Sequence, residues 1–345
     1  MRIYDTIIIG SGPAGLSAGI YAARAEMDFC VIERASVSGG QVLSTYEVDN
    51  YPGLPGLSGG ELAQKMREHC EKLGCTFVTD EVTEITPGVI ASNGFFNEVV
   101  LDRPDNTGVS AENAAEPRTE NLTQPIDWSR LVYMITLADG EPLLTKTIVA
   151  ATGASHRLLG AEGEEEFTGM GVSYCATCDG AFFKGKNVAV VGGGDVAVED
   201  AVFLSKMCAK VYLIHRRNEF RAAKTLVTKA RAIENIEFIT ESVVGRISGS
   251  DSVEGMRIVN VGTHEERDIK VSGVFIAVGI TPASGLFRNL VACNEGGYII
   301  ADESGRTSCP GIFAAGDVRK KPLRQIVTAA ADGANCITSV EGYLI

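Results

Sequence analysis

The chain has 345 residues, which at roughly 150 residues per domain allows two domains with sizeable cores. Its formal net charge of −13 argues against non-specific binding of nucleic acid. Glycine occurs 39 times and tryptophan once, a composition that suits an α/β protein with several tight turns. The nine cysteines, an odd number spread through apolar segments, favour a reducing compartment over a disulfide-stapled secreted chain.

The sequence shows no targeting or membrane-spanning segment. It begins at Met1 and enters a predicted strand almost at once, which leaves no room for a signal sequence. No apolar run reaches the length of about 18 residues that a membrane helix needs. We therefore expect a cytoplasmic protein.

A glycine-rich turn opens the chain. Residues 5–9 predict a strand, and a helix of small residues runs through Arg24. Between them lies the turn Gly10, Ser11, Gly12, Pro13, Ala14 and Gly15. In such a turn the first glycine permits the bend, the second lets the backbone approach a pyrophosphate, and the third lets the helix pack closely on the strand.

A second strand, residues 29–32, delivers Glu33, 23 residues after Gly10. A carboxylate at that place can accept hydrogen bonds from ribose hydroxyls. The spacing predicts a dinucleotide site, and the alternative is a purely structural turn.

The next segments carry less information. Residues 39–53 have the composition of a polar loop, residues 61–73 predict an amphipathic helix, and residues 76–85 predict a strand. From about residue 88 to 128 the pattern dissolves into polar residues, which indicates an insertion. Strands are expected again at 131–137 and, after a turn at Asp139-Gly140, at 147–151, which indicates a β-hairpin with a long excursion.

The most informative stretch is Cys175-Ala176-Thr177-Cys178-Asp179-Gly180. Two thiols at this spacing can close a small disulfide that a thiolate can reopen. Half of a zinc site and a pair of buried thiols are the alternatives. The other seven cysteines form no second CxxC, which a structural zinc site of this type would want.

The first pattern then repeats. Strands at 187–191 and 210–214 enclose the turn Gly192, Gly193, Gly194, Asp195, Val196 and Ala197 and a helix to about Met207. At the 23-residue offset the acid is replaced by His215, Arg216 and Arg217, with Arg221 following. Guanidinium groups favour a 2′-phosphate where a carboxylate favours a free hydroxyl. The first fold is therefore expected to hold a non-phosphorylated nucleotide and the second NADPH.

The rest of the chain predicts strands at 236–247, 253–261 and 271–278. An apolar strand beginning at Gly311 ends on Gly316-Asp317, where an acid could hold a ribityl chain. Arg324-Gln325-Ile326 then leads into a helix through about Ser339.

With two unequal dinucleotide folds, CATCDG before the second and AAGDV near the C-terminus, the chain resembles the low-molecular-weight, bacterial-type thioredoxin reductases. The resemblance implies an α/β protein with two Rossmann-like dinucleotide-binding domains, the second inserted into the first. The FAD-binding domain would comprise residues 1–153 and 281–345, and the NADPH-binding domain residues 154–280. The resemblance also suggests a homodimer.

The same resemblance assigns cofactor contacts. FAD would be bound by Gly10, Ser11, Gly12, Pro13, Ala14, Gly15, Glu33, Arg34, Gly39, Gly40, Gln41, Asn50, Val82 through its backbone, Gly316, Asp317, Arg324, Gln325 and Ile326. NADPH would be bound by Gly192, Gly193, Gly194, Asp195, Val196, Ala197, His215, Arg216, Arg217 and Arg221. One departure is Val196, because the family usually has a Ser or Thr there that bonds the pyrophosphate.

The implied reaction passes electrons from NADPH through FAD to the Cys175–Cys178 disulfide and on to oxidised thioredoxin. Cys178 would face the flavin, Cys175 would attack the substrate, and Asp179, its pKa raised by poor solvation, would manage the thiol proton. We also expect the inserted domain to rotate about connections near Gly153-Ala154 and 279–282.

Three alternatives remain from the residues. A flavin-dependent dithiol oxidase would use the same cysteines but would not need the basic cluster. A reductase acting on another thioredoxin-like protein or a peroxiredoxin would share the core. A non-catalytic nucleotide-binding or redox-sensor protein is the third alternative, and the intact dithiol and the charge of −13 give it little support.

Overall fold

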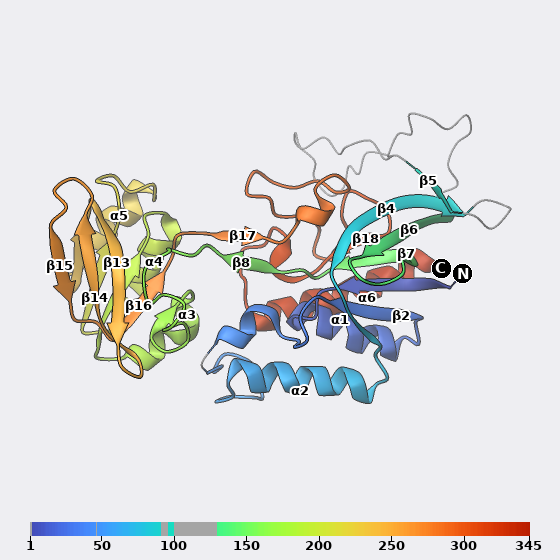
Figure 1. Cartoon of the computed structure of the whole chain (residues 1–345), viewed down its shortest axis with the longest axis horizontal. Coiled ribbons are helices and arrows are strands. Elements are labelled where there is room, and N and C mark those ends of the chain that lie inside the picture. Colours follow the sequence, from blue (N-terminus) through green and yellow to red (C-terminus); the bar gives the residue numbers. More distant parts are fainter. Residues whose placement is uncertain (1, 46, 91–95, 100–129) are drawn as a thin grey trace. The chain divides into compact units, whose positions relative to one another are not determined.

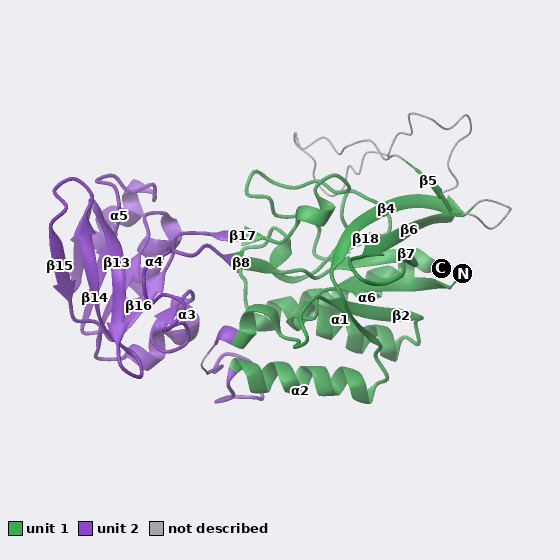
Figure 2. Cartoon of the chain, viewed as in Figure 1, with its two compact units in different colours: residues 1–43, 59–155, 281–345 green, residues 44–58, 156–280 purple. Residues whose placement is uncertain are grey.

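The computed structural model describes residues 2–45, 47–90, 96–99 and 130–345. The chain divides into two compact units, coloured separately in Figure 2. Unit 1 comprises residues 1–43, 59–155 and 281–345, and unit 2 comprises residues 44–58 and 156–280. Most of the predicted excursion between residues 88 and 128 lies outside the described residues.

Strands and helices alternate over residues 3–79 and again over residues 187–239, whereas strands follow one another over much of the remaining chain (Figure 1). The helices are α1 (Pro13–Arg24), α2 (Gly59–Lys72), α3 (Ala176–Asp179), α4 (Asp195–Ser205), α5 (Lys224–Arg231) and α6 (Ile326–Leu344). The strands of unit 1 are β1 (Ile3–Ile9), β2 (Phe29–Glu33), β3 (Phe77–Thr79), β4 (Val82–Ile90), β5 (Phe96–Glu98), β6 (Leu131–Leu137), β7 (Leu143–Ala150) and β18 (Ile312–Ala314). Those of unit 2 are β9 (Val172–Ser173), β10 (Asn187–Val191), β11 (Lys210–Ile214), β12 (Ile236–Ile239), β13 (Ser242–Gly249), β14 (Val253–Asn260), β15 (Glu266–Ile269) and β16 (Gly273–Ile276).

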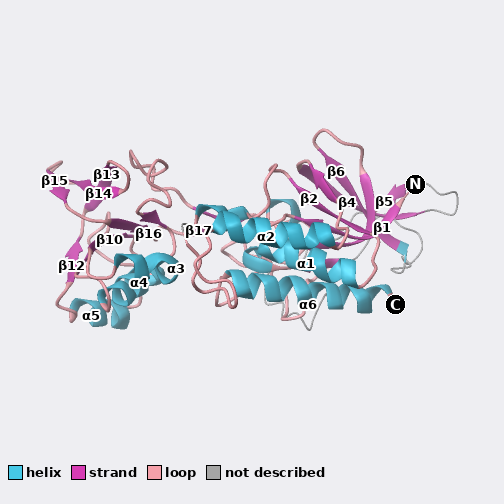
Figure 3. Cartoon of the chain, turned by 90° about the horizontal axis from the view of Figure 1, so that it is seen from below, coloured by secondary structure: helices cyan, strands magenta, loops and turns pink. Residues whose placement is uncertain are grey.

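Unit 1 is built on a mixed sheet in the order β3-β2-β1-β7-β6-β4-β5, with β18 also paired to β7. The pairs among β3, β2, β1, β7 and β18 are parallel, whereas β6, β4 and β5 join in antiparallel fashion. The predicted hairpin of β6 and β7 is confirmed, with Tyr133 opposite Thr145. Parallel strands buried on both faces need helical cover, and Figure 3 shows α1 between α2 and α6.

Unit 2 repeats the arrangement on a smaller scale. Its parallel sheet has the order β12-β11-β10-β16-β9, and α4 follows β10 as α1 follows β1. A separate antiparallel sheet, β13-β14-β15, packs its apolar residues with one face of the parallel sheet through Ile247, Met256 and Ile258. The predicted fold, two Rossmann-like domains with the second inserted, is confirmed.

Two short strands, β8 (Ala154–His156) and β17 (Ile280–Pro282), carry the chain from one unit to the other and pair with each other. The amide of Arg157 donates to the Gly279 carbonyl at 3.0 Å, and that of Ala283 donates to the Gly153 carbonyl at 3.0 Å. Sequence reasoning placed connections here but did not predict their pairing.

Two predicted strands are each divided in the structure. The strand predicted at 76–85 is two, β3 and β4, because the chain turns at Asp80-Glu81. The strand predicted at 236–247 is also two, β12 and β13, because Glu241 has a φ of 50° and breaks the extended run. Among the described residues, no helix is long and apolar enough to cross a membrane.

Candidate redox and nucleotide-binding sites

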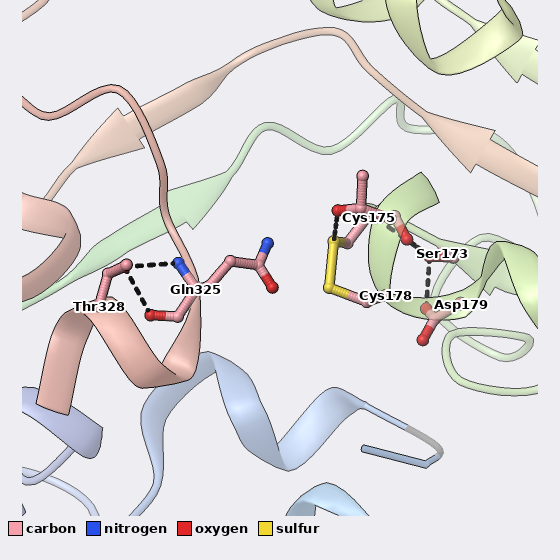
Figure 4. Close-up of a disulfide and its surroundings, with 7 residues drawn as sticks. Ser173, Cys175, Cys178, Asp179, Gln325 and Thr328 are labelled. Carbon is pink, nitrogen blue, oxygen red and sulfur yellow. Dashed lines mark hydrogen bonds between the residues drawn. A yellow bond between two sulfur atoms is a disulfide. The ribbon is translucent and has the colours of Figure 1, made fainter. Parts of the chain in front are cut away.

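The CxxC motif forms a disulfide in unit 2, directly before the second glycine turn. Cys175 caps the N-terminus of α3 and Cys178 lies within that helix, so the two Cα atoms are 5.3 Å apart (Figure 4). Both cysteines are partly exposed. The Thr177 hydroxyl lies 3.4 Å from Cys175 Sγ. A partly exposed disulfide on a short helix is open to thiolate attack.

Ser173, which sequence reasoning missed, links the disulfide to Asp179. Its hydroxyl donates to Asp179 Oδ2 at 2.5 Å and accepts a hydrogen bond from the Cys175 amide at 3.1 Å. Burial raises the pKa of Asp179, and the bond from Ser173 opposes that rise by stabilising the carboxylate. The second oxygen, Oδ1, is buried and has no partner in the described structure. Asp179 is therefore a carboxyl group suited to hold a proton beside the dithiol.

Tyr174, next to Cys175, is held from two sides. Its ring stacks on His156 with centroids 4.8 Å apart, and its hydroxyl donates to Glu164 Oε1 at 3.0 Å. Glu164 is buried, and it also accepts from the amides of Leu159 at 2.9 Å and Gly160 at 2.7 Å. The segment that leaves β8 is thereby tied to the residue preceding the disulfide.

The first glycine turn has little room for side chains. Gly10 has a φ of +103°, and a Cβ there would lie 2.5 Å from the Ala151 carbonyl oxygen. A Cβ on Gly15 would lie 1.8 Å from the Gly10 oxygen, so the first turn of α1 packs directly on the end of β1. Glu33 at the end of β2 accepts from the Ser11 amide and the Ser11 hydroxyl, both at 2.8 Å. The acid at the predicted spacing therefore lies against the turn.

Gly12 and Gly40 leave a space that a side chain would fill. A Cβ on Gly40 would lie 3.8 Å from Gly12 Cα, and one on Gly12 would lie 3.8 Å from the Gly39 oxygen, with no closer neighbour in either case. The adjacent Gln41 donates through Nε2 to the Ala154 carbonyl at 2.5 Å. A glycine-lined gap at the N-terminus of α1, where Pro13 and Ala14 begin the helix, fits a pyrophosphate.

The C-terminal segment brings unsatisfied polar atoms to the same unit. Asp317 Oδ1 and Arg324 Nε are buried without a partner among the described residues. Burial raises the pKa of Asp317, and Lys321 and Arg324 oppose that rise. Such atoms fit a polar ligand that supplies the missing hydrogen bonds. Gln325 is the N-cap residue of α6 and forms a capping box, in which its backbone amide donates to Thr328 Oγ1 at 3.1 Å (Figure 4). Ile326 is the first helical residue.

A hollow of about 600 Å³ lies at the carboxyl ends of β2 and β3. Arg34, Ala35, Thr79, Asp80 and Glu81 line it with Ala138 and Asp139. Val82 begins β4 directly after this lining. Ligands of open α/β sheets bind at such strand ends, so this hollow fits part of the nucleotide predicted for unit 1.

Asp332 of α6 organises a buried ionic cluster that sequence reasoning missed. Its carboxylate accepts from Lys321 Nζ at 2.6 Å, from Arg319 Nε at 3.0 Å and from the Gly316 amide at 2.9 Å. All three charged side chains are at most 9% exposed. The cluster fixes the chain that carries Asp317. No local pattern reveals it, because its members are spread over 17 residues and two kinds of element.

The second glycine turn differs from the first in one respect. A Cβ on Gly192 would lie 2.4 Å from the Ala277 oxygen, which parallels Gly10, and Gly194 has no neighbour within 4 Å. At Gly193, however, the buried ring of His215 takes the space, 2.2 Å from where a Cβ would lie. His215 Nε2 lies 3.1 Å from the Glu219 oxygen. The buried ring of His215 therefore packs against Gly193 on the inner side of the turn. A nucleotide bound at the surface would contact the exposed residues that follow, Arg216 and Arg217.

Arg216, Arg217 and Arg221 are exposed, and none forms an ion pair with a carboxylate in the part of the chain that is described. Burial lowers the pKa of His215, and the charges of these three arginines lower it further. They thus form one positive patch at the end of β11. Asp195 Oδ1 accepts a hydrogen bond from the Ala223 amide at 2.8 Å. Ala197 is buried in α4. Val196 is 61% exposed, an apolar side chain where a phosphate-binding turn would gain from a hydroxyl.

Asn50 lies in the segment 44–58, which groups with unit 2. It was predicted as an FAD contact, whereas the other predicted FAD contacts belong to unit 1.

Comparison with known proteins identifies the family of the chain. The pattern of the pyridine nucleotide-disulphide oxidoreductases matches residues 4–333. The chain belongs to this family. Thioredoxin reductase from Listeria monocytogenes is 39% identical over 99% of this chain and 94% of its own length, and that from Bacillus subtilis is 38% identical over 99% and 95%.

Solved structures give the same result. Thioredoxin reductase from Streptococcus pyogenes aligns with a TM-score of 0.83 and 41% identity, covering 99% of this chain and 98% of its own. The resemblance to bacterial-type thioredoxin reductases, predicted from the sequence, is therefore confirmed.

Proposed function

We propose that this protein is an NADPH-dependent thioredoxin-disulfide reductase with FAD as its resident cofactor. The observation that carries the proposal is the Cys175–Cys178 disulfide. In the sequence it follows the first glycine turn and directly precedes the second. Relatives named thioredoxin reductase match over nearly the whole length, which supports the same activity here.

FAD would be held in unit 1 by the Gly12 and Gly40 gap, Glu33 and Asp317. Its isoalloxazine ring would supply the exchange between hydride transfer from NADPH and electron transfer to a disulfide. In unit 2 the turn at Gly192 to Gly194 would receive the NADPH pyrophosphate. The patch of Arg216, Arg217 and Arg221 would bind its 2′-phosphate through charge-assisted hydrogen bonds.

Cys175, Cys178 and Asp179 would each have a different role in the thiol–disulfide exchange. Once the disulfide is reduced, the Cys175 thiolate would attack the substrate disulfide, forming a mixed disulfide and releasing one substrate thiolate. The Cys178 thiolate would then attack Cys175 Sγ, which restores the Cys175–Cys178 disulfide and releases the second substrate thiolate. Asp179 would give up and take back the proton in these steps, because its pKa is raised and Ser173 holds it in place.

The inserted unit would turn about its two connections, β8 and β17, so that the dithiol and the nicotinamide can each reach the flavin. Gly153 and Gly279, beside these strands, have φ values of 70° and 120°. A chemical cross-link that locks the two units together should abolish turnover. Unchanged steady-state turnover in the cross-linked protein would rule out the rotation.

The proposed activity is tested by anaerobic titration of the purified flavoprotein with NADPH and, in parallel, NADH. We expect NADPH to bleach the flavin at the lower concentration, and oxidised thioredoxin to restore the colour. A Cys175→Ser variant should still be bleached but should not pass electrons to thioredoxin.

Failure of both nicotinamides to bleach a flavin that small dithiols can reduce would contradict the proposal. It would favour the dithiol oxidase. Bleaching by NADPH without recovery on adding thioredoxin, but with recovery on adding a peroxiredoxin, would favour a different protein partner.

We further propose a homodimer located in the cytoplasm. Light scattering during size-exclusion chromatography tests the first point, since a monomer mass of 36.5 kDa should double. Fractionation of the source cells tests the second.

A further inference from the structure

The end of α2 brings a second pair of cysteines together, in unit 1. Gly74 has a φ of +82°, its amide donates to the Glu71 carbonyl at 2.9 Å, and the Cys75 amide donates to the Cys70 carbonyl at 3.1 Å. These two bonds define a Schellman motif, which places the side chains before and after the helix end in contact. In this chain the two side chains are Cys70 and Cys75.

Both thiols pack on α1. Cys70 Sγ donates to the Leu16 carbonyl at 3.1 Å, and Cys75 Sγ donates to the Gly19 carbonyl at 3.4 Å. Each sulfur lies 3.7 Å from the place of a Cβ on Gly19. Both sulfurs therefore pack against Gly19 of α1, with Cys70 fully buried and Cys75 8% exposed.

The pair differs electrostatically from the other five cysteines that lie outside the disulfide. The interaction between the two thiols lowers the pKa of Cys75, and the same interaction together with burial raises the pKa of Cys70. In contrast, burial raises the pKa of Cys30 to about 12 and that of Cys309 to about 11, and it also raises the pKa values of Cys208, Cys293 and Cys336. A cysteine with a lowered pKa and a second thiol beside it is the one of such a pair that an oxidant attacks more readily.

We propose that Cys70 and Cys75 form a second dithiol site, which peroxide oxidises to a disulfide. The Cys75 thiolate attacks one peroxide oxygen, so that an S–O bond forms, the O–O bond breaks and the released hydroxide takes a proton to become water. The Cys70 sulfur then attacks Cys75 Sγ, an S–S bond forms, and the hydroxyl leaves with the Cys70 proton as a second water. Two thiols lose two electrons, and hydrogen peroxide gains them.

Two apolar side chains would make the same helix-end contact, so packing alone does not require cysteine at either position. The site is independent of the proposed reductase activity, since it uses neither nicotinamide nor the Cys175–Cys178 pair.

The test uses the full-length protein, reduced, freed of reductant, exposed to hydrogen peroxide, alkylated and digested with trypsin. Because Lys72 lies between the two cysteines, a Cys70–Cys75 disulfide would join two tryptic peptides, residues 68–72 and 73–118, each containing a single cysteine. We expect this linked pair by mass spectrometry, sensitive to dithiothreitol and formed at least about tenfold faster than oxidation of Cys30 or Cys208.

Two variants test which of the two cysteines reacts with peroxide first. In Cys70→Ser, Cys75 should stop at sulfenic acid, which dimedone captures, whereas in Cys75→Ser no dimedone adduct should form at Cys70. The Cys175–Cys178 disulfide, formed in the same sample, shows that the oxidant was active. If that disulfide forms while residues 68–72 and 73–118 stay unlinked in the native protein, or link only after denaturation, the proposal is wrong.

Discussion

The buried carboxylate of Asp332 stabilises the segment between Gly316 and Lys321. The carboxylate compensates Arg319 and Lys321, which are 2% and 9% exposed, and it also fixes the Gly316 amide beside Asp317. Removing one partner leaves uncompensated buried charge, which costs more than an exposed ion pair contributes.

We therefore expect Asp332→Asn to lower the free energy of unfolding by about 3 kcal/mol, measured by urea denaturation. Glu303→Gln is the matched control, because Glu303 contacts the same arginine at 3.2 Å but is 91% exposed. That control should change stability by at most about 0.5 kcal/mol. Equal midpoints for the two variants would show that Asp332 does not carry the cluster.

Ser173 should control the titration of Asp179. Its hydroxyl stabilises the carboxylate, so Ser173→Ala should raise the pKa of Asp179 above its already raised value. If Asp179 is the proton donor, the alkaline limb of the activity profile moves to higher pH, because the acid keeps its proton longer. The carboxyl ¹³C shift, followed against pH in the oxidised protein, measures this directly.

Thr177→Ala serves as the control for that titration, since the Thr177 hydroxyl lies 3.4 Å from Cys175 Sγ, whereas the bond to Asp179 comes from Ser173. A Ser173→Ala variant whose Asp179 carbon titrates as in the native protein would remove Ser173 from this role.

Asp200 of α4 supplies a pH-dependent term in stability. Burial, assisted by the charge of Glu199, raises the pKa of Asp200 to about 7. Between its usual pKa and this value the folded protein holds a proton that the unfolded chain has released. Stability contributed by this group is therefore present at low pH and is lost as pH rises toward 7.

Asp200→Asn should remove that loss. The variant should gain stability relative to the native protein between pH 5 and pH 8, by about 1 to 3 kcal/mol, as measured by urea unfolding at each pH. Glu199→Gln should weaken the dependence only slightly, because its charge is the lesser cause. A constant difference between variant and native protein across this range would contradict the assignment.

At the scale of elements, the close approach of β1 and α1 is decisive for the first nucleotide site. Gly15→Ala would place a Cβ 1.8 Å from the Gly10 oxygen, so the first turn of α1 must move. We expect the purified variant to retain little flavin and to unfold at lower urea concentration. The ratio of flavin to protein absorbance measures the first effect.

Gly60→Ala is the control for this substitution. Gly60 lies in α2 and has no neighbour within 4 Å of its potential Cβ. The control should keep its flavin and gain up to about 1 kcal/mol of stability, because alanine favours a helix over glycine. Full flavin retention by Gly15→Ala would show that the turn tolerates displacement.

At the scale of the whole molecule, the hydrophobic clusters formed by the described residues each belong to one unit. One hydrophobic cluster, including Ile7, Ile148 and Phe287, lies entirely in unit 1, whereas two others, around Val274 and Val190, lie entirely in unit 2. Cores that share no residues can unfold separately.

We therefore expect two transitions in scanning calorimetry. Asp332→Asn should lower one and Asp200→Asn should alter the other, while added FAD raises the first and NADP⁺ the second. At a ligand concentration of about 100 times Kd the stabilisation is about 2.7 kcal/mol. A single transition, shifted alike by both variants and both ligands, would show that the units unfold as one.

The sequence alone determined the features that depend on contiguous residues. Each glycine turn, the strand before it and the helix after it occupy one stretch, and so do CATCDG and the arginines after β11. Local backbone requirements dictate these patterns, and for that reason the fold class and the family could be predicted from them. The boundaries were less accurate where a single residue such as Glu241 interrupts an extended run.

Only the tertiary structure decided which distant groups meet. It placed Arg319 and Lys321 on Asp332, Tyr174 on His156 and Glu164, and the helix end that carries Cys70 and Cys75 against Leu16 and Gly19 of α1. Charged and sulfur-containing side chains carry no periodic signal of their partners. Their pairing follows from the packing of helices on sheets, which brings together residues that the chain keeps far apart.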